Sequence, residues 1–220
     1  MGASTTRLEA VRRARRSLAD VGPPYSRAEG DFARVSLPDG DGDVLRDLLI
    51  EAGASIVSEV GLAYGSSALA VAEALLVQGH REPAHLIVDA FQDVFGDAGW
   101  AVLDGAGLGT LCTLVRDRSQ LALPRLLADG FIADAAFVDG SHIFHNVFVD
   151  LYFLRELVRP GGLVVCDDCD SAPVATAVGY FQANTGWVPV AIGAATRLRA
   201  FRLPDLRVEP GFHEFMPFGP

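Results

Sequence analysis

The chain has 220 residues, half of them hydrophobic, and this favours one domain with a substantial core over two small ones. Its net charge of -10 leaves no broad basic surface to attract phosphates, so we expect no nucleic-acid partner. Every basic residue is an arginine. The absence of lysine excludes the Walker A phosphate loop, the pyridoxal Schiff base and the kinase ATP lysine.

The cysteines and the apolar runs bear on the compartment. Cys112, Cys166 and Cys169 form an odd number without the spacing of a disulfide framework, and the N-terminus does not resemble a signal peptide. We therefore expect a cytoplasmic protein. No apolar run reaches the roughly 18 residues that a membrane-spanning helix needs, so the sequence predicts a soluble protein without a membrane partner.

The first 41 residues carry no strand pattern and predict one or two helices, followed by a linker, PDGDGD, at residues 38–43. The arginine-rich stretch RLEAVRRARRS is typical of an exposed helix face, and the alternative is a basic arm for an acidic partner. This N-terminal segment is a candidate to cover a site or to pack against a partner subunit. A homodimer is therefore one possible assembly.

From residue 42 onward, short apolar runs alternate with longer amphipathic segments, the pattern of an α/β domain with helices packed on a largely parallel sheet. Several runs are apolar throughout, as expected for strands covered on both faces. Two further runs, WVPVAIG and TRLRAFRL, are close enough for an antiparallel pair, and a proline-rich, irregular tail follows. The predicted strands are 55–60, 85–90, 110–115, 135–139 and 162–168, and the predicted helices are 66–79, 119–130, 144–162 and 173–186.

The segment SEVGLAYGSSALAVAEALL joins the first predicted strand to a helix through a turn that contains Gly61 and Gly65. Glycine permits the backbone angles and the close ligand approach of such a turn, and the helix start offers free N–H groups to a ligand. The spacing E-x-G-x-x-x-G differs from the G-x-G-x-x-G of a dinucleotide site. A structural turn without a ligand accounts for the same two glycines.

Asp89 ends the second predicted strand, where a carboxylate can accept both hydroxyls of a ribose. An acidic residue at this position can also simply start a loop. Together with the glycine turn, Asp89 favours a nucleoside ligand whose other end is not a pyrophosphate.

Residues 42–202 resemble the class I S-adenosylmethionine-dependent methyltransferases, particularly small O-methyltransferases of the catechol type and their natural-product relatives. The segments that carry the resemblance are EVGLAYGSS, VDAF, RSQLALPRL, FVDGSH and LVRPGGLVVCDD. The resemblance implies a Rossmann-like, doubly wound α/β sheet of seven strands, mostly parallel with an antiparallel final strand. The methyltransferase domain would span residues 42–203, after a cap segment at 1–41 and before a tail at 204–220. Its implied acceptor is a small-molecule hydroxyl.

The resemblance also implies a binding site for S-adenosylmethionine at the carboxyl ends of the strands. The turn after the first strand would lie along the methionine part, with the Ser67 hydroxyl suited to its carboxylate, and Asp89 would hold the ribose. The start of the helix after the third strand would border the adenine. The residues so implied are Glu59, Gly61, Ala63, Tyr64, Gly65, Ser67, Asp89, Arg118, Ser119, Gln120 and Asp139.

Catechol-type relatives bind Mg²⁺ through an aspartate after the fourth strand and a pair of acidic or amide residues after the fifth. The matching positions are Asp139, Asp167 and Asp168. Three hard oxygen ligands suit Mg²⁺ and leave positions for water and for the acceptor oxygen, whose pKa the ion would lower. The alternative is that Asp167 and Asp168 only cap the loop and that Asp139 binds only cofactor, as in metal-free methyltransferases.

The sequence departs from the catechol pattern at the general base. In those enzymes a lysine stands three residues after the first metal aspartate, and His142 occupies that position here. Its ordinary pKa of about 6.5 suits proton removal near neutral pH, so His142 and Asp139 are the predicted catalytic residues. A histidine base is familiar in relatives that methylate sugars or macrolides. We interpret His145 as a cap or surface residue.

Three other functions fit parts of the sequence. The C-x-x-C of Cys166 and Cys169, with His142 and His145, has the inventory of a zinc site, although Cys166 lies in an apolar run that suits the core. A nicotinamide-dependent oxidoreductase explains the turn and Asp89 but lacks the third glycine and a Tyr-x-x-x-Lys group. A non-catalytic protein that binds the cofactor is the third alternative.

Aromatic residues near the motifs are candidates for the wall of an acceptor pocket, although such spacings are more common in a core. They are Phe91, Phe95, Trp100, Phe144 and Phe148.

Overall fold

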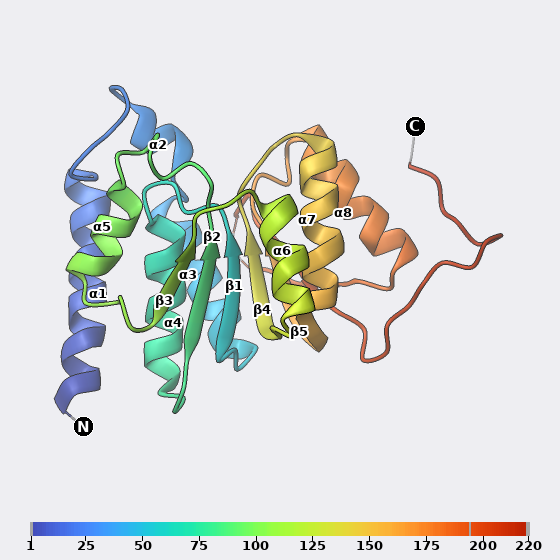
Figure 1. The fold of residues 1–220 in the computed structure, drawn as a ribbon, viewed down its shortest axis with the longest axis horizontal. Helices are drawn as coiled ribbons and strands as arrows, with labels where there is room; N and C mark the ends of the chain where they lie inside the picture. The colour runs from blue at the N-terminus through green and yellow to red at the C-terminus, as the bar shows by residue number, and fades with distance from the viewer. Residues whose placement is uncertain (1, 194, 219–220) are drawn as a thin grey trace.

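Seven strands form one sheet in the order β3-β2-β1-β4-β5-β7-β6 in the computed structural model, which describes residues 2–193 and 195–218 (Figure 1). The first five strands are parallel to one another, and β7 is antiparallel to both β5 and β6. This confirms the predicted doubly wound sheet, including its antiparallel strand. The strands are β1 (Ile56–Val60), β2 (Ala84–Val88), β3 (Cys112–Val115), β4 (Ala133–Val138), β5 (Val158–Cys166), β6 (Val188–Val190) and β7 (Arg199–Arg202).

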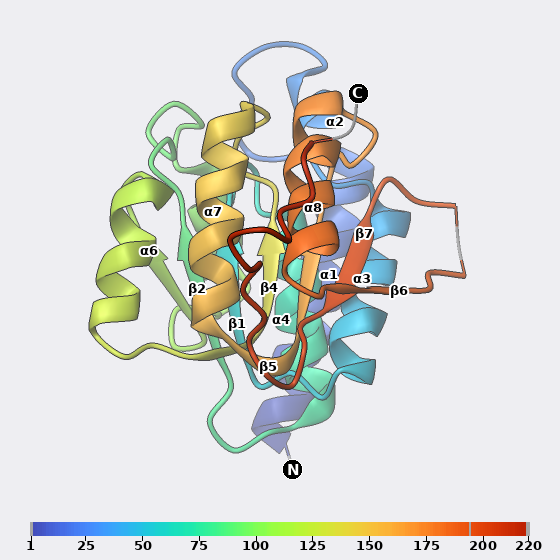
Figure 2. The same cartoon turned by 90° about the vertical axis from the view of Figure 1, so that its right-hand side faces the viewer.

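Helices cover both faces of the sheet (Figures 1 and 2). On one face α3 packs against α4, and α1 packs on α4; on the other, α7 lies between α6 and α8. Within the described residues, none of the helices combines the length and the apolar character that crossing a bilayer requires. The helices are α1 (Gly2–Val21), α2 (Asp31–Val35), α3 (Asp39–Glu51), α4 (Ser66–Gln78), α5 (Ala98–Gly105), α6 (Ser119–Ala128), α7 (Phe144–Leu157) and α8 (Ala172–Asn184).

The central strand β4 shows why the sheet has helices on both sides. Its side chains alternate between the two main hydrophobic clusters: Ala135 and Phe137 belong to one, and Ala136 and Val138 belong to the other. All four are buried. Because successive side chains of a strand point to opposite faces, an apolar run of this kind needs cover on both sides.

Helix α1 is attached to the domain through a buried carboxylate on α4. Glu73 accepts hydrogen bonds from Arg12 Nε at 2.8 Å and from Arg15 Nη1 at 2.6 Å. Burial opposes the charged form of Glu73, but the two arginines outweigh it and lower the pKa of this carboxyl. The exposed helix face expected for the arginine-rich stretch is therefore wrong at Arg15, which is buried because its acidic partners lie on α3 and α4.

Three local predictions differ from the structure. PDGDGD is not a linker: α3 begins at Asp39, and its acidic first turn interacts favourably with the helix dipole. Helix α7 ends at Leu157, and residues 158–161, expected in the helix, begin β5, where a register shift next to Ala133 accommodates them. Helix α5 was not predicted because its glycine-rich segment is typical of a loop.

Residues 204–218 run beside α7 and α8 without regular structure (Figure 2). Asn184 donates to the carbonyl of Met216 at 3.0 Å and accepts from its N–H at 2.7 Å. Phe218 packs against Phe144 and Tyr180. These contacts attach the tail to the helices.

Candidate active site

The turn between β1 and α4 brings the ends of β1 and β4 together. Gly61 has a φ of 96°, and a Cβ at this position would lie 2.1 Å from the carbonyl oxygen of Asp139. Both the angle and the close approach require glycine. Gly65, with a φ of 87°, is the N-cap of α4 and leaves the first N–H groups of that helix at the carboxyl end of the sheet.

Replacing Gly61 by alanine is expected to lower the free energy of unfolding by about 3 kcal/mol or more, because the new methyl group would displace the backbone that carries Asp139. Gly79→Ala is the matched control: Gly79 has a φ of 64°, but a Cβ there meets nothing within 4 Å. Gly79→Ala should lower the free energy of unfolding by only about 1 kcal/mol, the cost of placing a non-glycine residue in the left-handed region. Urea unfolding measures both losses, and equal losses would show that the close approach is unimportant.

Asp89, at the end of β2, holds the glycine turn. Its Oδ2 accepts the backbone N–H groups of Leu62 at 2.8 Å and Ala63 at 3.1 Å, and the side-chain amide of Gln92 at 3.2 Å. Within the described residues, its Oδ1 accepts one hydrogen bond, from the N–H of Phe91 at 2.6 Å. A carboxylate oxygen can accept two hydrogen bonds, so Oδ1 retains capacity for a ligand hydroxyl.

Glu59 lies behind the turn, fully buried, and does not line the cavity. Its Oε1 accepts the Ser67 hydroxyl at 2.5 Å, and its Oε2 lies 2.6 Å from Nε2 of His85. Burial alone would lower the pKa of His85, but contacts with Cys112 and Glu59 raise it to about 9. A protonated His85 thus compensates the buried carboxylate, and Glu59 orients Ser67 from behind.

The end of β4 and the loop after β5 form an acidic cluster that includes one histidine. Nε2 of His142 lies 2.7 Å from Oδ2 of Asp168 and 3.8 Å from Oδ1 of Asp139. Burial, followed by the negative charges of Asp167 and Asp168, raises the pKa of Asp139. Asp139 and Asp168 in turn raise the pKa of His142. The carboxylates therefore favour the protonated imidazole.

Asp167, next to this cluster, is buried and pairs with an arginine. Its Oδ2 accepts Nη2 of Arg197 at 2.7 Å, and its Oδ1 accepts the N–H of Asp168 at 2.7 Å. Arg197 also lies 3.3 Å from Oδ1 of Asp168. This arginine was not predicted, because it comes from the loop before β7, about 30 residues later, and no motif surrounds it.

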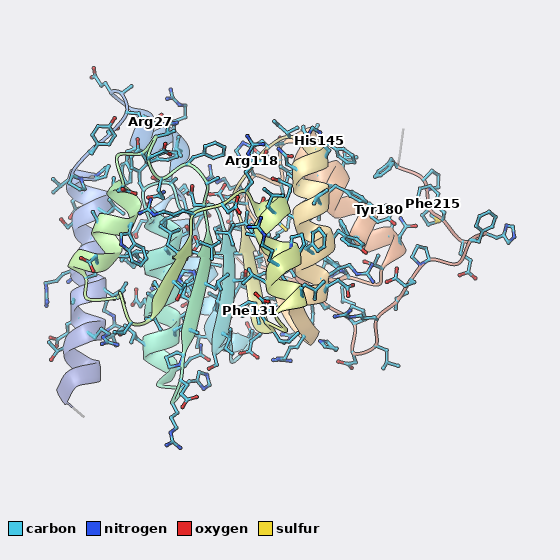
Figure 3. The ribbon with its side chains drawn as sticks, in the orientation of Figure 1. Arg27, Arg118, Phe131, His145, Tyr180 and Phe215 are labelled. Atoms are coloured by element: carbon cyan, nitrogen blue, oxygen red, sulfur yellow. The ribbon has the colours of Figure 1, made fainter. Side chains whose placement is uncertain are left out.

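One cavity of about 830 Å³ lies across the carboxyl ends of the strands. Most of the predicted site residues line it, whereas Glu59, Gly65 and Asp167 do not. Figure 3 shows Arg118 at the same end of the molecule as Arg27 and His145. The predicted residues on its wall are Gly61, Ala63, Tyr64, Ser67, Asp89, Arg118, Ser119, Gln120, Asp139, His142 and Asp168, and Arg34, Ser36, Ile143, Asn146 and Ser171 were not predicted.

The aromatic candidates divide between the cavity and the core. Phe91 and Phe95 line the cavity. Phe148 packs on Tyr180 and Phe181 in the cluster beneath α7 and α8. Trp100 and Phe144 also pack against the main clusters.

The zinc alternative has no support in the geometry. Cys166 and Cys169 are buried, and His145 is exposed. In the part of the chain that the structure describes, the group of side chains able to hold a metal is Asp139, His142 and Asp168, without a cysteine.

A sheet of this order, with a glycine turn after β1 and acidic side chains after β2, β4 and β5, is the class I methyltransferase architecture. Residues 58–169, half of the chain, match a family model described as "Methyltransferase domain". The chain belongs to this methyltransferase family, which confirms the predicted enzyme class and removes the basis for the nicotinamide alternative. No curated protein matches the chain.

Solved structures share the fold at low identity. The O-methyltransferase TomG from Streptomyces achromogenes, in complex with SAM, is 18% identical over 89% of this chain and 90% of its own, with a TM-score of 0.68. A putative O-methyltransferase from Klebsiella pneumoniae is 17% identical over 93% and 90%, with a TM-score of 0.67. The Bacillus cereus O-methyltransferase in complex with SAH is 15% identical over 90% of each chain, with a TM-score of 0.63.

Proposed function

We propose that this methyltransferase transfers the methyl group of S-adenosylmethionine to a hydroxyl of a small molecule, with His142 as the general base and a divalent cation such as Mg²⁺ beside it. One observation carries the proposal. The glycine turn, Asp89, residues 118–120 and the His142 cluster all line the same cavity, so a nucleoside ligand and a proton acceptor meet in one space.

The cavity is large enough for two ligands. Its volume of about 830 Å³ is at the upper end of the range typical of small-molecule sites. The cofactor would lie along the glycine turn, Asp89 and the start of α6, and the acceptor would occupy the remainder, beside Phe95, Asn146 and Ser171. TomG is described as acting in tomaymycin synthesis and CalS11 as a calicheamicin methyltransferase, which supports a natural product as the acceptor.

His142 is the proposed base because of its position and exposure. Its side chain is 55% exposed and lines the cavity, and Asp168 and Asp139 lie beside Nε2. These carboxylates would stabilise the imidazolium that forms when Nε2 takes the acceptor proton. Bound S-adenosylmethionine would supply the methyl group, and a bound cation would lower the pKa of the acceptor hydroxyl.

The donor atoms fit a divalent cation. One donor atom each of Asp139, His142 and Asp168 lies within 4.8 Å of the others. Oxygen donors from Asp139 and Asp168 suit Mg²⁺. Asp167 remains the proposed third carboxylate, with Arg197 as its partner in the structure. We assign catalysis to residues 42–203, with residues 1–41 as a cap and 204–220 as a tail.

Titration calorimetry with S-adenosylmethionine, S-adenosylhomocysteine and NAD tests the proposal. We expect binding of the first two ligands and none of NAD. Binding of NAD alone would contradict the proposed cofactor. Binding of S-adenosylhomocysteine without turnover on any hydroxyl acceptor of a broad panel would favour the non-catalytic alternative.

A further inference from the structure

The segment between α1 and α3, residues 22–38, lies at the carboxyl end of the sheet (Figure 1), and its residues 34–37 line the cavity. Residues 24–30 of this segment are all exposed, yet the next residue, Asp31, is only 2% exposed. Burying a carboxylate is costly unless it is paired and hydrogen-bonded. The contacts of Asp31 therefore indicate what the segment is fixed to.

Asp31 is bound by the glycine turn and by its own segment. The Tyr64 hydroxyl donates to Oδ2 at 2.5 Å, and Tyr64 accepts the N–H of Arg27 at 3.1 Å. The Arg27 guanidinium donates to both carboxylate oxygens, at 2.7 and 3.0 Å, and Arg34 Nη2 donates to Oδ1 at 2.7 Å. Arg27 and Tyr64 hold the pKa of Asp31 well below its usual range, so Asp31 stays charged at any physiological pH.

Aromatic contacts surround this ionic group. Tyr64, Phe95 and Ala98 form a small hydrophobic cluster, separate from the two main ones, against which Phe32 packs. Tyr64 meets Phe32 and Phe95 edge to face, with ring centroids 5.6 and 5.0 Å apart. Arg27 lies over the Phe95 ring, 4.3 Å from its centroid. Tyr64 thus joins the N-terminal segment to the glycine turn and to the loop after β2.

The part of the segment held in this way forms a wall of the cavity. The residues of this segment that line the cavity follow shortly after Asp31 and are Arg34, Val35, Ser36 and Leu37. Ser36 is 9% exposed, and its Oγ has no hydrogen-bond partner within the described residues. A buried hydroxyl on a cavity wall without a protein partner suits a hydrogen bond to a bound ligand.

We infer that Asp31 is a positioning residue that fixes residues 31–37 on Tyr64, as a wall that contacts the bound cofactor. Asp31 itself does not line the cavity, so it acts through the wall. The inference rests on the proposed cofactor, and S-adenosylhomocysteine is the probe.

Asp31→Asn and Tyr64→Phe keep the side-chain shapes and remove, respectively, the charge and the hydroxyl. Each is expected to weaken S-adenosylhomocysteine binding about tenfold in calorimetry, since each breaks a charge-assisted hydrogen bond. The double variant should be no weaker than the worse single variant, because both act on one contact. Amide hydrogen exchange of residues 31–37 should accelerate at least about tenfold while that of β1 and β4 stays unchanged.

Asp47→Asn and Tyr152→Phe are the controls, because both side chains are exposed and lie outside the cavity wall. If Asp31→Asn and Tyr64→Phe bind S-adenosylhomocysteine like these controls, the inference is wrong and the proposed function stands. If the wild type does not bind S-adenosylhomocysteine, the proposed function fails. In that case the positioning role is judged by amide hydrogen exchange of residues 31–37 in Asp31→Asn. Unchanged exchange would overturn that role as well, and accelerated exchange would support it.

Discussion

His142→Ala is expected to lower kcat by about 10²- to 10⁴-fold, the usual contribution of a general base, while the Kd for S-adenosylhomocysteine changes by less than about threefold. The two effects should separate because His142, beside Asp168 and Asp139, lines the part of the cavity that we propose for the acceptor. Steady-state kinetics with a hydroxyl acceptor and calorimetry with S-adenosylhomocysteine measure them. His145→Ala, on the exposed start of α7, is the control and should retain full turnover.

The pH dependence adds a second readout. The carboxylates raise the pKa of His142 above its ordinary value, so the neutral form that can accept a proton is lost as the pH falls through this raised pKa. Turnover of the wild type should therefore fall on the acidic side, and His142→Ala should lack this limb. If His142→Ala turned over as fast as the wild type, His142 would have no role in the mechanism.

The fold was predictable because its signals are local. β1 and β4 are almost wholly buried, and the apolar run AAFV that ends β4 is visible in the sequence without knowledge of its neighbours. The boundaries were harder. PDGDGD has the composition of a linker, and a distant contact supports its helical structure: Arg15 of α1 pairs with Asp39 and Asp43, and no local window contains all three residues.

The candidate site was predictable where its residues directly follow strands. Asp89 and Asp139 end β2 and β4, and parallel strands bring their carboxyl ends to one edge of the sheet. The side-chain directions were not predictable. Asp167 and Asp168 are adjacent in the sequence, but only Asp168 lines the cavity, because Arg197 binds Asp167 from a distant loop. The contact of Asp31 with Tyr64, 33 residues apart, depends in the same way on tertiary packing.

Removal of divalent cations is expected to lower turnover at least about tenfold, and Mg²⁺ should restore it, because the carboxylates of Asp139 and Asp168 converge in the cavity beside His142. The measurement compares kcat of chelator-washed enzyme with and without added Mg²⁺. Asp168→Asn should abolish the stimulation. Asp170→Asn, an exposed position on the same loop, is the matched control and should preserve it. Wild-type turnover that is indifferent to EDTA would remove the metal from the proposal.

Asp167→Asn separates two roles for the third carboxylate. Mg²⁺ must compete with Arg197, which lies 2.7 Å from Oδ2 of Asp167 and 3.3 Å from Asp168. If Asp167 is a ligand, Asp167→Asn should lose the stimulation as fully as Asp168→Asn does. If Asp167 instead only shares Arg197 with Asp168, the guanidinium released from Asp167 would pair more fully with Asp168, and higher Mg²⁺ concentrations should restore turnover. A Mg²⁺ titration of both variants therefore decides which carboxylates bind the ion.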